Sequence, residues 1–421
     1  MTPKVSLEQF GGLPMPRNII FVAPFPIETT MRFARAAAKL EDVRLLGVVH
    51  TPPDAGGPDG RLFDDIVRVT DPLSGQDVLD GVEVLKRRHG QPHRIIGILE
   101  PLMVQMAEAR EKFGVKGTRA KTAELFRDKA TMKDALRAAG LPVAKHKLVT
   151  SEADARAFAA EVGFPMVLKP PAGMGAKATF RVTSEEALLD AVRGMRVGPS
   201  SPVLAEEFLR GREFSMETVT IGGKPKVHSI SHYMPSCLEV LENPWIQWVC
   251  MLPRELDEPV YEKARKMGFA AIEALGLDDG MTHMEWFERP DGTLAIGEIA
   301  QRPPGANISR MTGLVHGIDP YRAWARAVVD GELDAPWQRK YAVGCAFLRG
   351  MGQGRVTGVT GVAEANAAVG NLIVEAKLPT LGATKADSYE GDGFVILQHE
   401  RTDVVRAALK KVIESVKVHY A

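Results

Sequence analysis

The chain has 421 residues, and its 53 basic and 53 acidic side chains cancel to a formal net charge of zero. This balance excludes the strong positive field that draws many proteins to nucleic acid or anionic lipid. No stretch approaches the roughly 18 apolar residues of a spanning helix, and the N-terminus lacks an apolar signal core, so we expect a cytoplasmic protein without membrane or nucleic-acid partners. A chain of this length predicts two to four domains.

The first third of the chain alternates short apolar runs with helical segments. The runs at 19–23, 43–49 and 95–99 predict strands, and a helix is expected from about 29 to 40. Together they predict a small doubly wound α/β unit. The first strand is followed by APFPIE and not by GxGxxG, so the sequence gives little support for a dinucleotide site there.

Helix signals dominate the next segment. A helix is expected from 119 to 140, with Asp128 as a cap, and Ser151-x-x-Asp154 is a capping pattern that opens another helix to about Val162. The three cysteines, at 237, 250 and 345, are far apart and show no CxxC pair, so neither a disulfide framework nor a zinc site is expected.

A hairpin with a glycine-bearing tip follows, formed by MVLKP (166–170), PAGMGAK (171–177) and ATFRV (178–182). Gly173 and Gly175 would let backbone amides approach phosphate oxygens, and Lys169, together with Lys177, would add positive charge. The alternative is a flexible hairpin tip with a solvated lysine.

Three acids, Glu206, Glu207 and Glu213, lie in the apolar segment VLAEEFLRGREFSMETV (203–219). Carboxylates beside an apolar strand are unfavourable unless they reach solvent or a partner, and an acceptor carboxylate suits a purine amino group or ribose hydroxyls. The alternative is a solvated edge strand, where charges protect against aggregation.

The segment MTHMEWFERPDGTLAIGEIAQRPPGAN (281–307) predicts a second hairpin around a Pro-Asp-Gly turn. A four-residue loop would pair Glu288 with Thr293, which makes Glu285 and Glu298 diagonal neighbours on one face, about 7–8 Å apart. Two such carboxylates would bind one divalent cation, and oxygen ligands favour Mg²⁺ or Mn²⁺. In this register His283 is opposite Glu298 and would orient it.

Arg302 follows Glu298 by four residues, in a loop that continues through Pro303 to Asn307. A guanidinium beside metal-binding acids suits a carboxylate or an acyl phosphate, which it can hold with two parallel hydrogen bonds.

The order of these features resembles the ATP-grasp superfamily from about residue 19 to the C-terminus. The resemblance implies ATP and Mg²⁺ (or Mn²⁺) as cofactors, with PAGMGAK as the lid over the phosphates. It also assigns site residues: Lys129 and Lys169 to the phosphates, Glu206 and the backbone from Glu207 to Leu209 to adenine, Glu213 to ribose, and Glu285 and Glu298 to the metals. One departure is Ala300, where the family frequently has asparagine as a further metal ligand; it puts the second metal's coordination in doubt.

The implied fold is a mixed α/β (α+β) ATP-grasp fold. Its expected parts are a Rossmann-like N-terminal domain at 1–115, a central domain with the small subdomain and the lid at 116–202, the large subdomain with the metal site at 203–338, and a β-rich C-terminal cap at 339–421. The cap is expected to close with a helix from Thr402 to about Val418.

Within the superfamily, the stretches EIAQRPPGAN and Gly317 to Pro320 look most like the carboxylate–amine ligase and L-amino acid ligase branch. That likeness implies an ADP-forming ligase for small carboxylates and amines, with amino acids as the expected substrates and a homodimer as one assembly. A biotin carboxylase-like or purine-pathway enzyme is an alternative, although the short glycine loop and the chain length argue against a carboxylase. A non-catalytic nucleotide-binding protein is another, suggested only by Ala300.

The roles of two further pairs of residues stay open. His228 and His232 would share a strand face, where they either contact substrate or serve as structural groups. Trp245 and Trp248 either line a substrate pocket or pack the domain.

Overall fold

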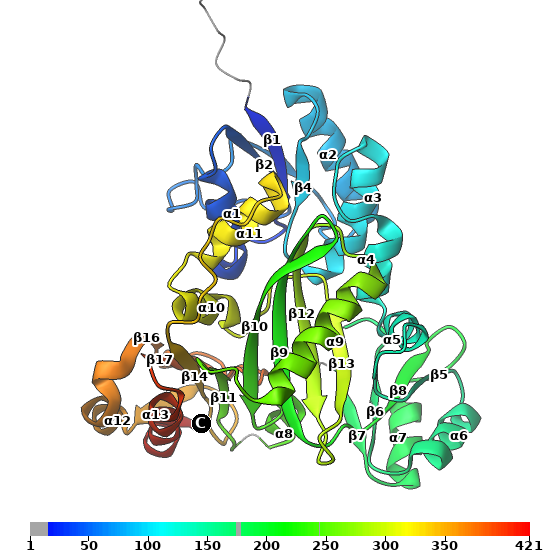
Figure 1. Cartoon of the computed structure of the whole chain (residues 1–421), viewed down its shortest axis with the longest axis vertical. Coiled ribbons are helices and arrows are strands. Elements are labelled where there is room, and N and C mark those ends of the chain that lie inside the picture. The colour runs from blue at the N-terminus through cyan, green and yellow to red at the C-terminus, as the bar shows by residue number, and fades with distance from the viewer. Residues whose placement is uncertain (1–15, 174–177, 244) are drawn as a thin grey trace, which may run out of the picture.

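The computed structural model describes residues 16–173, 178–243 and 245–421. It begins with a parallel sheet of order β3-β2-β1-β4, flanked by helices on both faces (Figure 1). Its elements are β1 (Arg17–Val22), α1 (Glu28–Ala38), β2 (Val43–Val49), β3 (Asp65–Arg68), α2 (Gly75–His89), β4 (Arg94–Ile96), the short 3₁₀ helix η2 (Glu100–Leu102) and α3 (Met103–Phe113). The doubly wound unit expected from the apolar runs is therefore present, with β2 at the predicted bounds.

A small antiparallel sheet of order β5-β8-β6-β7 follows, preceded by two helices. The elements are α4 (Ala120–Arg127), α5 (Lys129–Ala138), β5 (His146–Val149), α6 (Glu152–Val162), β6 (Met166–Lys169), β7 (Phe180–Val182), α7 (Glu185–Gly194) and β8 (Val203–Glu207). Asp128 divides the expected helix at 119–140 in two, because its side chain caps α5 by accepting the amide hydrogen of Thr131. Ser151 caps α6 through the amide of Asp154, as its capping pattern predicts.

The largest element is an antiparallel sheet of eight strands, ordered β13-β12-β9-β10-β11-β14-β17-β16. The strands are β9 (Arg212–Ile221), β10 (Lys224–Met234), β11 (Trp248–Leu252), β12 (Gly280–Glu288), β13 (Leu294–Ala300), β14 (Ala342–Leu348), β16 (Ile373–Lys377) and β17 (Gly393–His399). One face carries α9 (Pro259–Leu275), whose buried residues pack on Phe214, Met216 and Trp286. The other face of the strands from β9 to β13 is directed to the candidate site.

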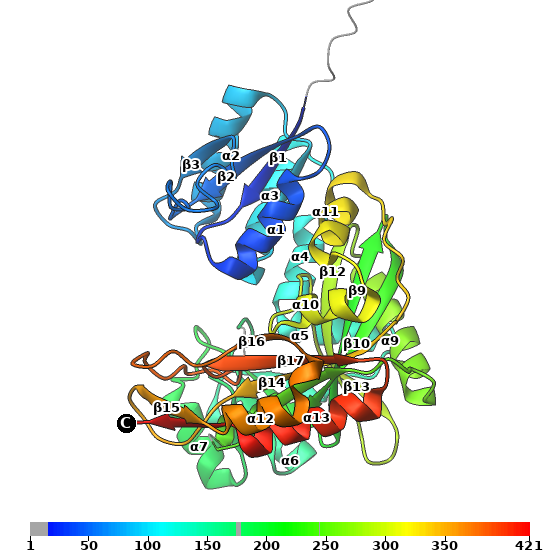
Figure 2. The same cartoon turned by 90° about the vertical axis from the view of Figure 1, so that its left-hand side faces the viewer.

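The remaining helices connect these parts. They are α8 (Cys237–Glu242), α10 (Ile308–His316), α11 (Pro320–Asp330), α12 (Val362–Val369) with the 3₁₀ turn η3 (Gly370–Leu372), and α13 (Thr402–Ser415). Helix α11 packs beside α1, where Trp324 meets Phe33 at 5.0 Å between ring centroids (Figure 1). Helices α12 and α13 lie over β14 and β17 (Figure 2).

One expectation about the elements is wrong, and one alternative is excluded. The final helix ends at Ser415 and not near Val418, because Val416 and Val418 are buried and Lys417–Tyr420 form strand β18, which pairs with β15 (Val356–Thr360). The acidic segment at 203–219 is not a solvated edge, since β8 lies between β5 and β6 and β9 lies between β10 and β12.

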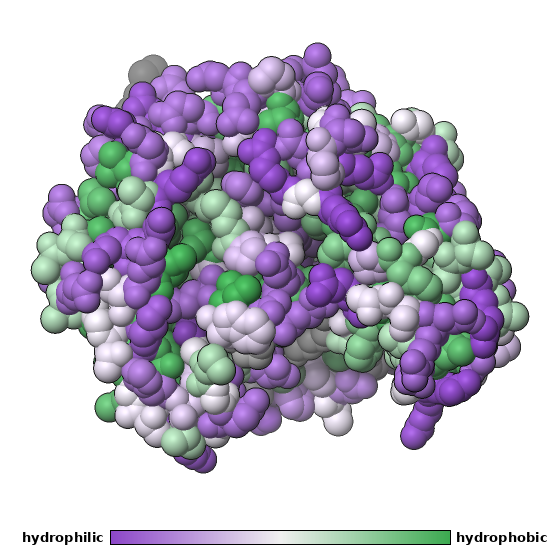
Figure 3. Space-filling model, turned by 90° about the horizontal axis from the view of Figure 1, so that it is seen from below, coloured by the Kyte–Doolittle hydropathy of each residue, from purple (hydrophilic) through white to green (hydrophobic). Residues whose placement is uncertain are grey.

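On the face seen in Figure 3, hydrophilic and hydrophobic residues are interspersed. Among the described residues, no helix combines the length and the apolar character needed to cross a bilayer.

Candidate functional site

A cavity of about 410 Å³ lies where the small sheet, the large sheet and the N-terminal unit meet. All the site residues predicted from the sequence that the structure describes line this one cavity; they are Lys129, Lys169, Gly173, Glu206, Glu207, Leu209, Glu213, Glu285, Glu298 and Arg302. Gly175 and Lys177 lie outside the described residues. Segments up to 173 positions apart in the chain, from Lys129 to Arg302, thus converge on one space, although the role of each residue stays a prediction.

Lys129, the first residue of α5, joins the two hairpins of the site. Its ammonium forms an ion pair with Glu298 Oε1 at 2.8 Å and donates to the carbonyl of Gly173 at 3.0 Å. The side chain of Lys129 is 8% exposed, so this charge is held in the cavity wall and not in bulk water. A cation between an acid pair and a glycine loop is well placed to meet a phosphate.

Glu206, on β8, is held between two lysines. Its oxygens lie 3.1 Å from Lys133 Nζ and 2.9 Å from Lys169 Nζ. Burial acts to raise the pKa of Glu206, but the two ammonium groups outweigh burial and bring that pKa to about 2. Sequence reasoning missed Lys133, although its place one helical turn after Lys129 would put both on the same face of α5.

Glu207 and Glu213 differ in their surroundings. Glu207 Oε1 accepts from the amide of Lys145 at 2.9 Å and from Arg289 Nη2 at 2.7 Å, which fixes the end of β8. Glu213 is buried on β9 and accepts from the amide of Cys237 at 2.9 Å. Burial, and then the charge of Glu285, raise the pKa of Glu213 to about 8.

Glu285 and Glu298 are directly opposite each other on β12 and β13, so the expected register is wrong in two places. The loop has five residues and not four, because Asp291 Oδ1 accepts from both the amide and the hydroxyl of Thr293, so that Glu288 pairs with Leu294. A bulge at Gly297 then adds a second shift of one residue. Since two shifts restore the alternation, both glutamates share a face, as expected, but as opposite neighbours and not diagonal ones.

His283 therefore does not lie opposite Glu298; its partner across the ladder is Ala300. Its Nδ1 lies 2.9 Å from Glu217 Oε1, and its Nε2 lies 3.6 Å from Glu285 Oε1. Burial acts to lower the pKa of His283, but the hydrogen bonds to Glu217 and Glu285 outweigh it and bring that pKa to about 9. The resulting imidazolium lowers the pKa of Glu285 against the effect of burial, so this carboxylate stays ionised.

Glu217 was also missed by sequence reasoning. The alternation Glu213-x-Ser215-x-Glu217 places three polar groups on one face of β9, and this pattern could have revealed it. The hydroxyl of Ser215 donates to Glu217 Oε1 at 2.7 Å, so the carboxylate that holds His283 is itself held.

The paired glutamates fit a magnesium ion that arrives with phosphates. Among the described residues no group of three or more His, Cys, Asp or Glu side chains is arranged to hold a metal. Mg²⁺ usually binds one or two carboxylates and completes its shell with substrate phosphate oxygens and water, so Glu285 and Glu298 suffice for this mode. At position 300 the structure places an apolar methyl group, which cannot contribute a ligand.

Arg302 is fixed by the N-terminal unit. Its Nε donates to Glu100 Oε2 at 2.8 Å, and Arg127 Nη1 donates to the other oxygen of Glu100 at 3.0 Å. The side chain of Glu100 is only 3% exposed. Sequence reasoning missed Glu100, although residues just beyond the carboxyl end of a parallel strand, here β4, often line ligand sites.

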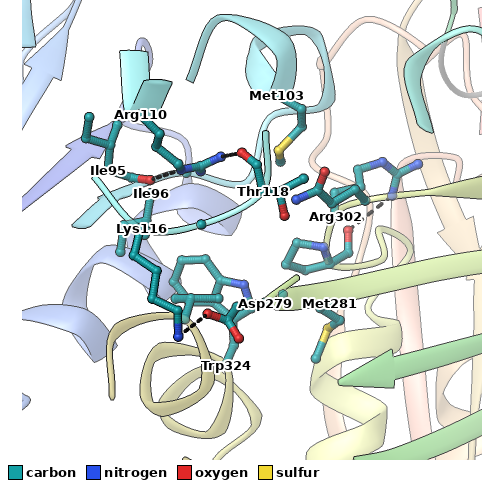
Figure 4. Close-up of a pocket in the computed structure, with 16 residues that line it drawn as sticks. Ile95, Ile96, Met103, Arg110, Lys116, Thr118, Asp279, Met281, Arg302 and Trp324 are labelled. Atoms are coloured by element: carbon teal, nitrogen blue, oxygen red, sulfur yellow. Dashed lines mark hydrogen bonds and ion pairs between the residues drawn. The ribbon is translucent and has the colours of Figure 1, made fainter. Parts of the chain in front are cut away.

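A second, much smaller cavity lies beside Arg302, between the N-terminal unit and α11 (Figure 4). Arg110 crosses it and donates to the carbonyls of Ile95 at 2.9 Å and Thr118 at 3.3 Å, while Lys116 pairs with Asp279 at 3.3 Å. Its volume of about 40 Å³ suits a few water molecules, each needing roughly 10–15 Å³. This second cavity is therefore too small for a nucleotide.

The structure answers part of the question about the roles of the two histidines and the two tryptophans. His228 and His232 lie on the α9 side of the large sheet, away from Glu285; His232 stacks on Phe214 at 4.5 Å. Burial lowers the pKa of both histidines to about 4, which fits neutral structural groups. Trp248 is buried against Phe347, whereas Trp245 is 59% exposed.

Residues 134–308 match the model of the ATP-grasp domain. An L-arginine-specific L-amino acid ligase of Bacillus subtilis is 28% identical over 252 residues, which are 59% of this chain and 60% of that protein. The crystal structure of an L-amino acid ligase from Bacillus licheniformis superposes with a TM-score of 0.76 and 19% identity over 97% of this chain and 100% of that one. For N5-carboxyaminoimidazole ribonucleotide synthetase from Thermotoga maritima the TM-score is 0.69, with 20% identity and coverage of 97% and 100%.

The chain thus spans less than two thirds of the curated relative, and the two solved structures, at such low identity, establish the fold alone. The mixed α/β fold expected from the sequence is confirmed: the N-terminal sheet is parallel and the other sheets are antiparallel.

Proposed function

Residues 134–308 of this chain are an ATP-grasp domain, and from that premise we propose that the protein is an ATP-dependent, ADP-forming ligase. It activates a small carboxylate as an acyl phosphate and transfers the acyl group to an amine, with amino acids as the expected substrates. The observation that carries the proposal is the single cavity in which two lysines, a pair of facing glutamates and a fixed arginine converge.

The nucleotide end of the cavity is formed by the small sheet and the start of β9. Lys129 and Lys169 bind the phosphates, and the backbone from Glu207 to Leu209 contacts the adenine edge. Glu213 binds the ribose hydroxyls. In the structure Glu206 has both oxygens engaged by Lys133 and Lys169, so its main contribution is to hold these ammonium groups in place.

Glu285 and Glu298 would hold Mg²⁺ against the phosphates, which supplies neutralisation of the charge on the transferring group. The ionised state of Glu285 is maintained by His283, which Glu217 orients. Lys129 contacts Glu298 and the carbonyl of Gly173 through two of its three N–H donors, so the third would meet an incoming phosphate oxygen. Positioning and charge neutralisation do most of the work in this kind of chemistry, and no nucleophilic side chain is required.

Arg302 binds the substrate carboxylate at the opposite end from the adenine. Glu100 holds the guanidinium through Nε, and Nη1 donates to the carbonyl of Pro303 at 3.1 Å, so the remaining N–H donors would bind a carboxylate or an acyl phosphate. The buried walls around this end limit the access of water, which would otherwise hydrolyse an acyl phosphate.

The test is a screen of acid and amine pairs with ATP and Mg²⁺, in which phosphate and ADP release is measured together with the condensed product. We expect phosphate release that requires both an acid and an amine. Release that instead requires bicarbonate would support a carboxylase-type or purine-pathway activity. Tight ATP binding in calorimetry without any turnover across the screen would contradict the proposal and favour a nucleotide-binding protein.

A further inference from the structure

The acids that line the large cavity are nearly all neutralised by a neighbouring cation. The pairs are Glu100 with Arg127 and Arg302, Glu206 with Lys133 and Lys169, Glu207 with Arg289, Glu285 with His283, and Glu298 with Lys129. Within the described residues, the two lining acids without an ion pair are Glu213, which accepts from a backbone amide, and Glu390. Glu213 belongs to the nucleotide end, so Glu390 is the acid that the proposed reaction leaves without a role.

Glu390 lies at the substrate end of the cavity. Glu390 lines the cavity together with Ala306, in the loop that begins at Arg302. Burial raises the pKa of the Glu390 carboxyl group, and the backbone of Ala306 acts in the opposite direction. The neighbouring Tyr389 also lines the cavity and packs edge-on against Trp248 at 4.8 Å. Tyr389 and Glu390 line the same cavity as Glu285 and Arg302.

The segment that carries Glu390 is rigidly tied to the sheet. The amide of Glu390 donates to Ser388 Oγ at 3.0 Å, and Asp392 Oδ1 accepts from the amide of Ala386 at 2.9 Å. The amide of Asp392 donates to the carbonyl of Leu348 at 3.1 Å, at the end of β14. Gly391 has a φ of 63°, and a Cβ there would lie 2.5 Å from the carbonyl oxygen of Leu348, so the turn requires glycine. Glu390 is thus presented to the cavity by a turn that has little freedom.

Partial burial of a carboxylate without a neighbouring cation costs free energy, unless a ligand supplies the opposite charge. Burial raises the pKa of Glu390, which reflects this cost in the ligand-free protein. A substrate cation placed beside the carboxylate would relieve the cost, and a charge-assisted hydrogen bond would add specificity.

We propose that Glu390 binds a cationic nitrogen of the substrate, an ammonium or guanidinium group other than the amine that is acylated. The attacking amine must be neutral to carry its lone pair to the acyl phosphate, so an ionised Glu390 serves a nitrogen that keeps its charge through the reaction. Arg302 and Glu390 would then hold opposite charges of one ligand, at the end of the cavity remote from adenine. This inference rests on the proposed ligase function, and it adds the residue that selects for positive charge.

The experiment compares substrates in matched pairs that differ by one cationic nitrogen: lysine with norleucine, arginine with citrulline, and alanine with propionate. Phosphate release gives kcat/KM for each compound with the wild type, Glu390→Gln and Glu390→Asp. In at least one pair we expect the wild type to prefer the cationic member by roughly 10- to 100-fold, the range of a hydrogen bond to a charged group. Glu390→Gln should lose that preference while it retains turnover of the neutral member, and Glu390→Asp should keep part of it.

Asp387→Asn is the matched control, because it removes a negative charge from the same segment at an exposed position outside the cavity. It should keep the wild-type preference. Two outcomes would overturn the inference: a wild type without preference in all three pairs, or a preference that survives Glu390→Gln. An equal loss of turnover with cationic and neutral compounds would also overturn it, because that result describes a proton acceptor or a structural residue.

A binding measurement separates this inference from the proposed reaction. Calorimetric titration of lysine and norleucine into the wild type and Glu390→Gln, in the presence of a non-hydrolysable ATP analogue, needs no turnover. If the wild type binds lysine more tightly and the variant does not, Glu390 binds a cation even when no ligase activity is found. If phosphate is released normally but lysine and norleucine bind alike, as do the members of the other two pairs, the ligase proposal stands and the role of Glu390 fails.

Discussion

Single residues in this protein act through their partners more than through their own chemical type. Lys129, Lys169 and Glu298 are ordinary side chains in the sequence, yet each is held by an opposite charge from another segment of the chain, whereas Glu285 is held by His283 on its own strand. The charges in the cavity are largely paired, so the phosphates and the metal of the proposed reaction would add to or replace existing ion pairs. Predictions at this scale therefore concern the removal of one member of a pair.

Replacement of Glu298 by glutamine should abolish metal-dependent turnover without unfolding the protein. The amide keeps the size of the carboxylate but loses the charge that, in the proposed reaction, would hold Mg²⁺ opposite Glu285, and loss of one such electrostatic group costs roughly 10²–10³-fold in kcat. Phosphate release across a range of Mg²⁺ concentrations, with circular dichroism as the check of folding, measures the effect. Glu288→Gln, on the same hairpin but outside the cavity, is the control; full activity in Glu298→Gln would refute the metal assignment.

Replacement of Glu100 by glutamine should weaken the use of the carboxylate substrate and leave the use of ATP unchanged. Glu100 contacts Arg302 and Arg127 but none of the expected nucleotide residues, so the variant would loosen the guanidinium that we propose binds the acid. We expect KM for the acid to rise about tenfold, as for loss of a hydrogen bond to a charged group, with KM for ATP within about twofold. Glu108→Gln, exposed on α3, provides the comparison. A rise in KM for ATP alone would disprove this positioning role.

Elements meet in this protein through buried charges as well as apolar contacts. Lys133 on α5, Glu206 on β8 and Lys169 on β6 form one buried cluster, so a helix and two strands of the small sheet depend on a single carboxylate. Lys133 also donates to the carbonyl of Gly297, the bulged residue of β13, which extends the cluster to the β12–β13 hairpin.

Glu206→Gln should therefore destabilise the protein by roughly 3–5 kcal/mol at neutral pH, the cost of leaving buried charges without their partner. The pKa of Glu206 in the folded protein is about 2, below its ordinary value of 4.5. The depressed pKa stabilises the fold above about pH 4.5, and this contribution is lost as the pH falls toward 2. Denaturant unfolding from pH 7 to pH 3 should show a steeper acid loss in the wild type than in the variant. Parallel pH curves for the two proteins would contradict the prediction.

At the scale of the whole molecule, one sheet unites the candidate site with the C-terminal part of the chain. Strands β14, β17 and β16 continue the sheet that contains the β12–β13 hairpin. Glu390 lines the cavity from the turn before β17. The ranges expected as domains, 203–338 and 339–421, thus share a sheet, and the boundary between them stays a prediction.

A chain that ends at residue 340 should not yield a folded, smaller enzyme. Its loss of β14 would expose the edge of β11, whose five residues are all buried in the full chain, together with the cluster around Trp248 and Phe347. An unpaired apolar edge of this kind favours aggregation. Soluble yield and size-exclusion chromatography of the truncated and full chains measure the effect, and a monodisperse truncated protein with a cooperative melting transition would show that the C-terminal strands are dispensable.

Local patterns in the sequence determined much of the fold and the membership of the site. Side chains close together in the chain predict the cap at Ser151, the strand at 43–49 and the β12–β13 hairpin. The resemblance to the ATP-grasp superfamily assigned the acids and lysines to one site. The register of that hairpin was beyond local rules, because the hydrogen bonds of Asp291 and the bulge at Gly297 each move it by one residue.

Only the tertiary structure decided which charges meet. The residues of the ion pair between Glu100 and Arg302 are 202 positions apart. The position of Glu390 near the loop at Ala306 depends on how β17 joins the large sheet. Residue types and spacing show which groups can carry charge, but the pairing of charges depends on distances in space. Those distances are set by packing between elements that lie far apart in the chain.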